Sequence, residues 1–236
     1  MRHRSRGFTL VEIAIVLVII GLLMIAVIKG QELIFSARVR NVIAQQEGVK
    51  IAVLGFQDRY RALPGDYATA STDINCGATQ CANGNGNGLV EAPNASGAWE
   101  SILSWHHLSA AGFLTGSYAM ASSATSLPDD GNTPRNVYGV YLQFAYDGVY
   151  GAGTTGAPSP RKHNLKTGTF IPVGIMAEVD RKIDDGDPFK GQLQFSFYAP
   201  AGFATPSATG CTTTTAAAGF WKISGGDSNC GGTSIF

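Results

Sequence analysis

The feature that most constrains this chain is an uninterrupted apolar run near its N-terminus. Residues 8–28 are apolar or small except for one charged side chain, Glu12. At about 1.5 Å per residue, a helix of this length just spans the ~30 Å hydrocarbon layer of a membrane. Arginines at positions 2, 4 and 6 precede the run, and basic residues favour the cytoplasmic end of such a helix. The run therefore predicts a transmembrane helix with a cytoplasmic N-terminus.

The carboxylate of Glu12 separates this segment from an ordinary membrane anchor. An ionisable group inside an apolar helix is costly, so it is treated as functional unless shown otherwise. A secretory signal peptide would place small residues at a cleavage site after the apolar run. Here Lys29, Gly30 and Gln31 follow instead, and helical patterning continues. We expect neither a plain signal peptide nor a plain anchor.

The residues around Glu12 resemble a known processing site. Residues 6–12 read Arg-Gly-Phe-Thr-Leu-Val-Glu, which is similar to the prepilin peptidase site of type IV pilins and of type II secretion pseudopilins. The resemblance implies cleavage after Gly7, N-methylation of Phe8, and a role for Glu12 in assembly. Residues 1–7 would then be a cleaved leader, and residues 8–28 a transmembrane and polymerisation segment.

A physical reason for Glu12 follows from this resemblance. Cleavage creates a positive amine at Phe8, and in a water-poor fibre core a nearby carboxylate can neutralise it. A buried charge without a partner costs several kcal/mol, whereas a paired one is tolerated. The pair would therefore set the axial register between subunits. Thr9 could help by hydrogen bonding to the same carboxylate, or it could be a small residue that is merely tolerated.

Helical patterning continues beyond the apolar run. Side chains spaced alternately four and three residues apart form one stripe on a helix: Phe35, Val39, Val42, Gln46, Val49, Val53, Phe56 and Tyr60. Pro64 and Gly65 end the pattern. We therefore expect one helix over residues 8–63, roughly 80 Å long, whose second half packs on a sheet.

Two glycines lie within this expected helix, at Gly21 and Gly30. Each weakens a helix by about 1 kcal/mol relative to alanine, so each could let it bend when subunits pack. Many pilins carry a proline where Lys29 stands here, and the Gly30 region is the place where we expect any non-helical stretch.

The remainder, residues 64–236, is rich in Gly, Ser, Thr and Asn and reads as a globular head. Periodicity predicts short helices near Ala98–Ala111 and Met176–Ile183. It predicts strands at Val137–Tyr146, Gly191–Tyr198 and Gly219–Ser224. The expected fold class is α+β: a long N-terminal helix packed on an antiparallel β-sheet head with long loops.

Four cysteines lie in the head, at positions 76, 81, 211 and 230. In an oxidising compartment the simplest pairing is local, Cys76–Cys81 and Cys211–Cys230, although three connectivities are open. The second pair also resembles the disulfide-bounded loop near the end of many pilins. Their spacing does not fit a zinc site.

Two segments are candidate calcium sites, although the expectation is that no cofactor is needed. The first carries side-chain oxygens at alternate positions, as calcium loops do: Asn83, Asn85, Asn87 and Glu91. The second is an acidic cluster: Asp180, Asp184, Asp185 and Asp187. The alternatives are a flexible turn-rich loop for the first segment and a solvated helix end for the second.

No motif points to an enzyme. His106 and His107 are adjacent, so they do not share a helix face, and we expect them to serve packing. A G-x-S-x-G elbow, a P-loop and a paired-carboxylate signature are all absent from the sequence.

Charge also limits the choice of partners. The chain has 17 basic and 17 acidic side chains and no long basic block, which disfavours nucleic-acid binding. Residues 64–236 carry eight basic and thirteen acidic side chains, so direct DNA capture by the head is not expected.

The leading hypothesis is a structural subunit that forms a homopolymeric type IV pilus. Before assembly it would lie in the bacterial inner membrane with prepilin peptidase and the pilus assembly machinery, and afterwards in an extracellular filament used for adhesion, motility or surface attachment. The alternatives are a type II secretion pseudopilin and a surface-anchored glycan-binding module that uses the pilin export route.

Overall fold

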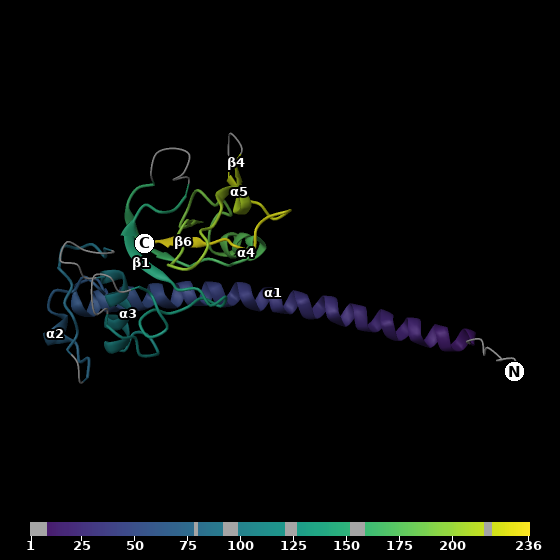
Figure 1. Cartoon of the computed structure of the whole chain (residues 1–236), viewed down its shortest axis with the longest axis horizontal. Helices are drawn as coiled ribbons and strands as arrows, with labels where there is room; N and C mark the ends of the chain where they lie inside the picture. Colours follow the sequence, from purple (N-terminus) through teal and green to yellow (C-terminus); the bar gives the residue numbers. More distant parts are fainter. Residues whose placement is uncertain (1–8, 78–79, 92–98, 121–126, 152–158, 215–218) are drawn as a thin grey trace. The chain divides into compact units, whose positions relative to one another are not determined.

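The computed structural model describes residues 9–77, 80–91, 99–120, 127–151, 159–214 and 219–236 (Figure 1). The chain divides into two compact units, one ending at Arg38 and the other beginning at Val39. The second unit contains every strand and every helix except the first half of α1. The two units are described separately below.

Helix α1 runs without interruption over Leu10–Tyr60. The expected start at Phe8 lies outside the described residues, and Thr9 precedes the first helical residue. Its end comes three residues earlier than Leu63, because Arg61 takes a left-handed backbone conformation with φ 56°. The helix passes through Gly21 and Gly30, so the non-helical stretch expected near Gly30 does not occur in this structure.

The second unit uses one face of α1 as the base of its core. The buried residues on this face are Val39, Val42, Gln46, Val49, Ala52, Val53 and Phe56. This is the predicted stripe without its two ends: Phe35 remains 40% exposed, and Tyr60 is half-buried. The 3.6-residue period of the helix explains why these positions share a face.

Four short helices complete the helical content of the described chain: α2 (Ala70–Asp73), α3 (Glu100–Ala110), α4 (Val173–Ile183) and α5 (Ala208–Cys211). The expected helices near residues 98–111 and 176–183 correspond to α3 and α4. Helix α3 gives way to Gly112, whose φ of 81° is the left-handed value that ends helices.

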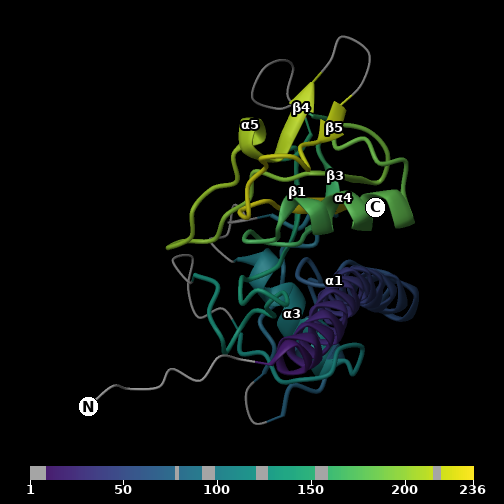
Figure 2. The same cartoon turned by 90° about the vertical axis from the view of Figure 1, so that its right-hand side faces the viewer.

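A four-stranded antiparallel sheet lies at the centre of the head. Its strands are β1 (Gln143–Asp147), β2 (Lys162–Lys166), β6 (Gly232–Ile235) and β3 (Leu193–Phe195), in that spatial order. A separate hairpin consists of β4 (Thr212–Thr214) and β5 (Gly219–Trp221). Both views place α5 beside β4 (Figures 1 and 2).

The α+β class and the antiparallel sheet are thus confirmed, but three details of the prediction were wrong. The strand expected at Val137–Tyr146 begins only at Gln143, because the Asn136 side chain accepts hydrogen bonds from Tyr138 N and Val140 N and holds a turn. The segment from Gly219 forms the hairpin rather than the main sheet. Strands β2, β4 and β6 were not anticipated.

Two buried clusters form the core. The first joins Val39 and Val42 to α4, β3, Trp221 and the Cys211–Cys230 pair. The second joins the Val49–Phe56 part of α1 to α3, β1 and β2, with Trp105 and Leu108 fully buried. The C-terminal half of α1 therefore supports the whole head.

Candidate functional site

The start of α1 is built around Thr9 and Glu12. The Thr9 N–H and Oγ1 both donate to Glu12 Oε2, at 2.7 and 2.9 Å, and Glu12 N–H donates to Thr9 Oγ1 at 3.2 Å. This reciprocal arrangement is a capping box, which satisfies backbone donors that a helix start leaves unpaired. Gly7 and Phe8 lie outside the described residues. The single charge of the apolar run is therefore held at the helix end by its neighbour.

The surface that follows Glu12 is apolar and unburied. From Leu10 to Ile28 every side chain is exposed, including Leu10 at 88% and Leu22 at 65%. Helix α1 contains a window of mean hydropathy 3.2, of which none is buried within the chain. By length and composition it can cross a membrane, and within the described residues no other helix has this property.

Gly21 and Gly30 lie inside this segment with open space around them. A Cβ added at either position would meet no atom within 4 Å, apart from the helix itself. Contacts within the chain therefore do not explain why these positions are glycines, and their expected role in helix flexibility remains a prediction.

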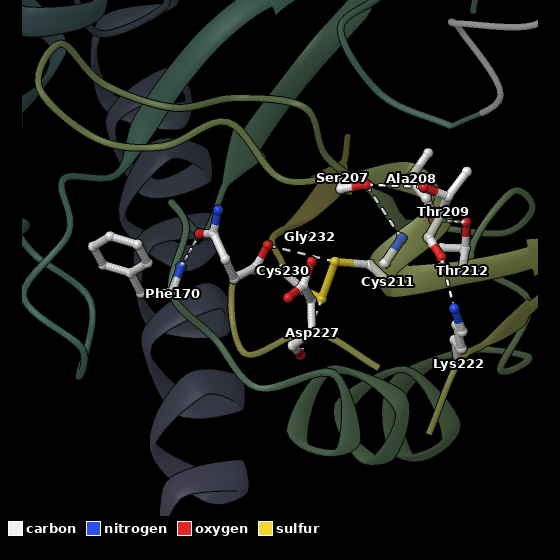
Figure 3. Close-up of a disulfide and its surroundings, with 12 residues drawn as sticks. Phe170, Ser207, Ala208, Thr209, Cys211, Thr212, Lys222, Asp227, Cys230 and Gly232 are labelled. Atoms are coloured by element: carbon white, nitrogen blue, oxygen red, sulfur yellow. Dashed lines mark hydrogen bonds between the residues drawn. A yellow bond between two sulfur atoms is a disulfide. The ribbon is translucent and has the colours of Figure 1, made fainter. Parts of the chain in front are cut away.

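The head contains two disulfides, Cys76–Cys81 and Cys211–Cys230, with Cα–Cα distances of 5.5 and 5.7 Å. Figure 3 shows the second of these with its surroundings. Ser207 caps α5 by accepting a hydrogen bond from Gly210 N, and Lys222 N donates to Cys211 O across the start of the hairpin. The Cys211–Cys230 bridge thus fastens the hairpin segment to the first core cluster.

The side-chain oxygens of the asparagine loop accept hydrogen bonds from backbone N–H groups of α2 and of the loop itself. Asn83 Oδ1 accepts from Ser71 N at 2.8 Å, Asn85 Oδ1 from Asn87 N at 2.9 Å, and Asn87 Oδ1 from Leu89 N at 2.8 Å. Glu91 accepts from Asn87 Nδ2. These bonds give the loop a structural explanation, while calcium binding there remains a prediction.

Two buried carboxylates that the sequence analysis did not single out complete this loop. Asp66 accepts from Asn87 N and Gly88 N at 3.0 and 2.8 Å. Glu100, with no exposed surface, accepts from Asn85 N and Glu91 N, each at 3.0 Å. The loop therefore directs backbone donors at carboxylates. A glycine-rich segment placed next to isolated acidic residues could have signalled this arrangement.

The adjacent histidines serve the fold. His107 is fully buried: its Nδ1 accepts from Gly65 N at 3.0 Å, and its Nε2 lies 2.9 Å from Ala82 O. Burial lowers the pKa of His107 to about 4, so it is neutral at physiological pH. His106 Nδ1 contacts Tyr118 O. The two rings link the end of α1 to the loops around α3.

Lys166 is another buried charged residue that the sequence analysis did not single out. It is 1% exposed and forms an ion pair with Asp147, and its Nζ donates to Gln143 Oε1 at 2.8 Å. Burial lowers the pKa of Lys166, and Asp147 opposes that change. A lysine within a strand rich in polar residues gives no signal of burial, because exposed strands read the same way.

Three of the four aspartates in the acidic cluster come together at the end of α4. One carboxylate oxygen each from Asp180, Asp184 and Asp185 lie within 4.8 Å of one another. Asp187 instead pairs with Lys190 at 3.0 Å. Burial raises the pKa of Asp180 to about 6; the hydrogen bond from Trp221 opposes this rise, and the charges of Asp184 and Asp185 add to it.

Comparison with known proteins identifies a motif in the N-terminal segment. Residues 2–28 match the family model described as the prokaryotic N-terminal methylation motif. No curated protein and no solved structure matches the chain. The match covers the segment that contains Gly7, Phe8, Thr9 and Glu12.

Proposed function

We propose, from the premise that this chain is a type IV pilin-like or pseudopilin precursor, that its mature form polymerises into a type IV pilus filament. The premise rests on residues 2–28, which carry the type IV pilin and prepilin signature, and on the apolar helix that begins at Leu10 within that segment. That family is structural rather than catalytic, and its motif implies processing by prepilin peptidase and delivery to a pilus-type assembly machinery.

The observation that carries the proposal is the unburied apolar surface of residues 10–28. Burying a large aliphatic side chain contributes about 1.5–3 kcal/mol, and this segment exposes more than a dozen of them. A membrane covers such a surface before assembly. In a filament, the same surface is covered by copies of the same helix, which removes it from lipid and links the subunits.

Glu12 and Thr9 give this surface its register. In the separate chain the Glu12 carboxylate is satisfied only by Thr9 among the described residues. After cleavage at Gly7, the new amine of Phe8 is a cation at the same end of the helix. In the proposed filament, pairing of that amine with a Glu12 carboxylate is the arrangement that leaves no buried charge without a partner.

The size of the head leads us to rank a pilus subunit above the second candidate, a type II secretion pseudopilin. Residues 64–236 are long for a pseudopilin head, and their two disulfides fit a head exported to an oxidising compartment. The presence of Glu12 favours a subunit of the filament body rather than of its tip. Residues 1–7 would be removed as the leader, and the mature chain would begin at Phe8.

Two measurements test this proposal. Mass spectrometry of the mature chain should find an N-methylated Phe8 as its first residue, and an intact Met1 would contradict the processing step. Filaments sheared from the cell surface should consist of this chain. Retention of the chain in the cell envelope, with secretion lost when the gene is deleted, would instead identify a pseudopilin.

A further inference from the structure

We propose that Asp180, Asp184 and Asp185 bind one calcium ion at the C-terminal end of α4. This site lies in the head and goes beyond the proposed role in polymerisation. One oxygen from each residue lies within 4.8 Å of the others. Calcium–oxygen distances are about 2.3–2.6 Å, so two oxygens on opposite sides of one ion are about 5 Å apart at most. The observed spacing therefore allows all three carboxylates to contact the same ion.

Asp180 supplies a second, independent observation. Its side chain has no exposed surface, and its Oδ1 accepts no hydrogen bond of standard geometry, although the backbone N–H of Gly186 lies close enough to stabilise the carboxylate. Its other oxygen, Oδ2, accepts from Trp221 Nε1 at 2.6 Å. A buried carboxylate oxygen without a partner is strongly unfavourable. A cation placed among the three carboxylates would satisfy this atom.

The other two aspartates also keep one oxygen available. Asp184 Oδ2 accepts from Leu193 N at 2.7 Å and from Gln192 N. Asp185 Oδ1 accepts from Asp187 N at 2.9 Å. Each residue thus uses one oxygen to hold the backbone and can offer the other to an ion. Water or backbone carbonyls would complete the six to eight ligands that calcium takes.

Neighbouring basic side chains do not neutralise this cluster. Arg181 and Lys182 both pair with Glu178, at 3.2 and 3.4 Å, and Lys190 pairs with Asp187. Within the described chain, none of the three clustered aspartates takes part in an ion pair of 4 Å or less. Three carboxylates lie together while the nearby cations are engaged elsewhere, which leaves the negative charge for a bound ion to balance.

The ligand type excludes zinc and copper, and the loop that carries two of the ligands favours calcium over magnesium. Carboxylate oxygens suit calcium, magnesium and manganese, whereas zinc and copper prefer sites with imidazole or thiolate. Magnesium requires near-ideal octahedral geometry at about 2.0–2.1 Å. Asp184 and Asp185 lie in a loop that turns at Gly186, with φ 80°, and such a loop suits the larger and less demanding ion.

The site would connect three parts of the head. Asp180 lies in the last turn of α4 and binds Trp221 of β5, and Asp184 binds the first residue of β3. Asp187 lies 3.4 Å from Gly219 N at the other end of β5. An ion held by the three clustered aspartates would therefore fasten the hairpin to α4. Calcium should stabilise the head against unfolding.

Terbium luminescence tests the site directly. Terbium(III) occupies calcium sites, and the indole of Trp221 is positioned beside Asp180 to sensitise its emission. In the full-length chain in detergent micelles, tryptophan excitation should give terbium emission that saturates at one ion per chain. Added calcium should displace terbium, and the same concentration of magnesium should displace at least tenfold less. Equal displacement by magnesium would overturn the choice of calcium.

Variants assign the binding to these residues. Asp185 is exposed, so the Asp185→Asn variant should fold normally. Its calcium binding should be at least tenfold weaker than that of the unmodified chain. Asp180→Asn should abolish binding. The matched control is Glu178→Gln, which removes a carboxylate from the same helix but from the Arg181 and Lys182 pairs; it should bind as the unmodified chain does. If Asp185→Asn binds as tightly as Glu178→Gln, the proposal is wrong.

Thermal unfolding gives a readout that does not depend on the tryptophan. Calcium should raise the melting temperature of the unmodified chain by several degrees, and a chelator should reverse the change. Asp185→Asn should show no calcium-dependent shift, whereas Glu178→Gln should keep it. A shift of equal size in both variants would place any bound ion elsewhere.

Discussion

The two halves of α1 have the same backbone and opposite surroundings. From Leu10 to Arg38 no residue is buried, although the segment is the most apolar of the chain. From Val39 to Tyr60, seven residues are buried against the head. The difference does not come from helix propensity, since both halves are helical. It shows that the chain supplies its own partner for one half, whereas the other half has no buried residue within the described chain.

The largest expected effect tests the half that lacks a partner. Glu12→Ala should leave the protein in the membrane but reduce filament yield by about a hundredfold or more, because an unpaired buried amine costs about 3–5 kcal/mol. Yield is measured as sheared filament protein relative to total protein. Glu32→Ala is the control, since Glu32 forms an exposed pair with Lys29 and should assemble normally. Normal filament yield from Glu12→Ala would refute the register argument.

A pair of substitutions tests the half that carries the head. Phe56 is fully buried and lies against the rings of Tyr60, Tyr67 and Phe113, so Phe56→Ala should lower the free energy of unfolding by about 3–5 kcal/mol. Leu54 is 50% exposed on the same helix, and Leu54→Ala should change the free energy of unfolding by less than about 1 kcal/mol. Urea unfolding in detergent measures both. Similar losses would mean that the two faces of α1 do not differ.

Acid should weaken the head through His107. Its folded pKa, about 4, lies below the ordinary value of 6.5, so the unfolded chain takes up a proton first as pH falls. The free energy of unfolding should therefore decrease between about pH 6.5 and pH 4, by about 3 kcal/mol in total. A proton on Nδ1 would also remove the acceptor of Gly65 N.

The control for this prediction is His107→Gln, which keeps a donor and an acceptor but does not titrate. Asp180 has a raised pKa of about 6 and acts in the opposite direction within the same pH range. The contribution of Asp180 is the same in the unmodified chain and in His107→Gln. It therefore cancels when the pH dependence of the free energy of unfolding is compared between the two proteins. Parallel pH profiles for the two proteins would contradict the role of His107.

The smallest effect compares glycines in the two halves. Gly30 and Gly48 both have open space at the Cβ position, so alanine should stabilise the helix by about 1 kcal/mol at each. Gly48→Ala should raise the free energy of unfolding of the head, whereas Gly30→Ala should slow only local amide exchange. Hydrogen exchange and urea unfolding distinguish the two. A rise in head stability from Gly30→Ala would show that the halves unfold together.

The sequence predicted the long helix, the α+β class and the buried stripe from Val39 to Phe56, because helical periodicity and apolar runs report burial directly. It failed for β2, whose sequence Lys-His-Asn-Leu-Lys looks exposed although its last three residues are buried. It also failed for β6, which has only four residues, the first three of them small. Both strands are stabilised by contacts with distant segments, which a local pattern does not contain.

The candidate sites divide in the same way. Thr9 and Glu12 are three residues apart, so their hydrogen bonding could be anticipated from local spacing. The burial of Asp180 depends on Trp221, which is 41 residues away in the chain. The roles of Asp66 and Glu100 depend equally on distant loop backbone. Sequence spacing could group the aspartates but could not show which of them is buried.

The buried stripe of α1 also determines how the head would carry load. If subunits are held through residues 10–38, tension enters the head at Val39, the first buried residue of the stripe. The stripe extends from there to Phe56, so seven buried side chains share the load. A head attached in this way resists extraction because its forced unfolding is slow. The strength of the attachment depends on the seven buried side chains of the stripe.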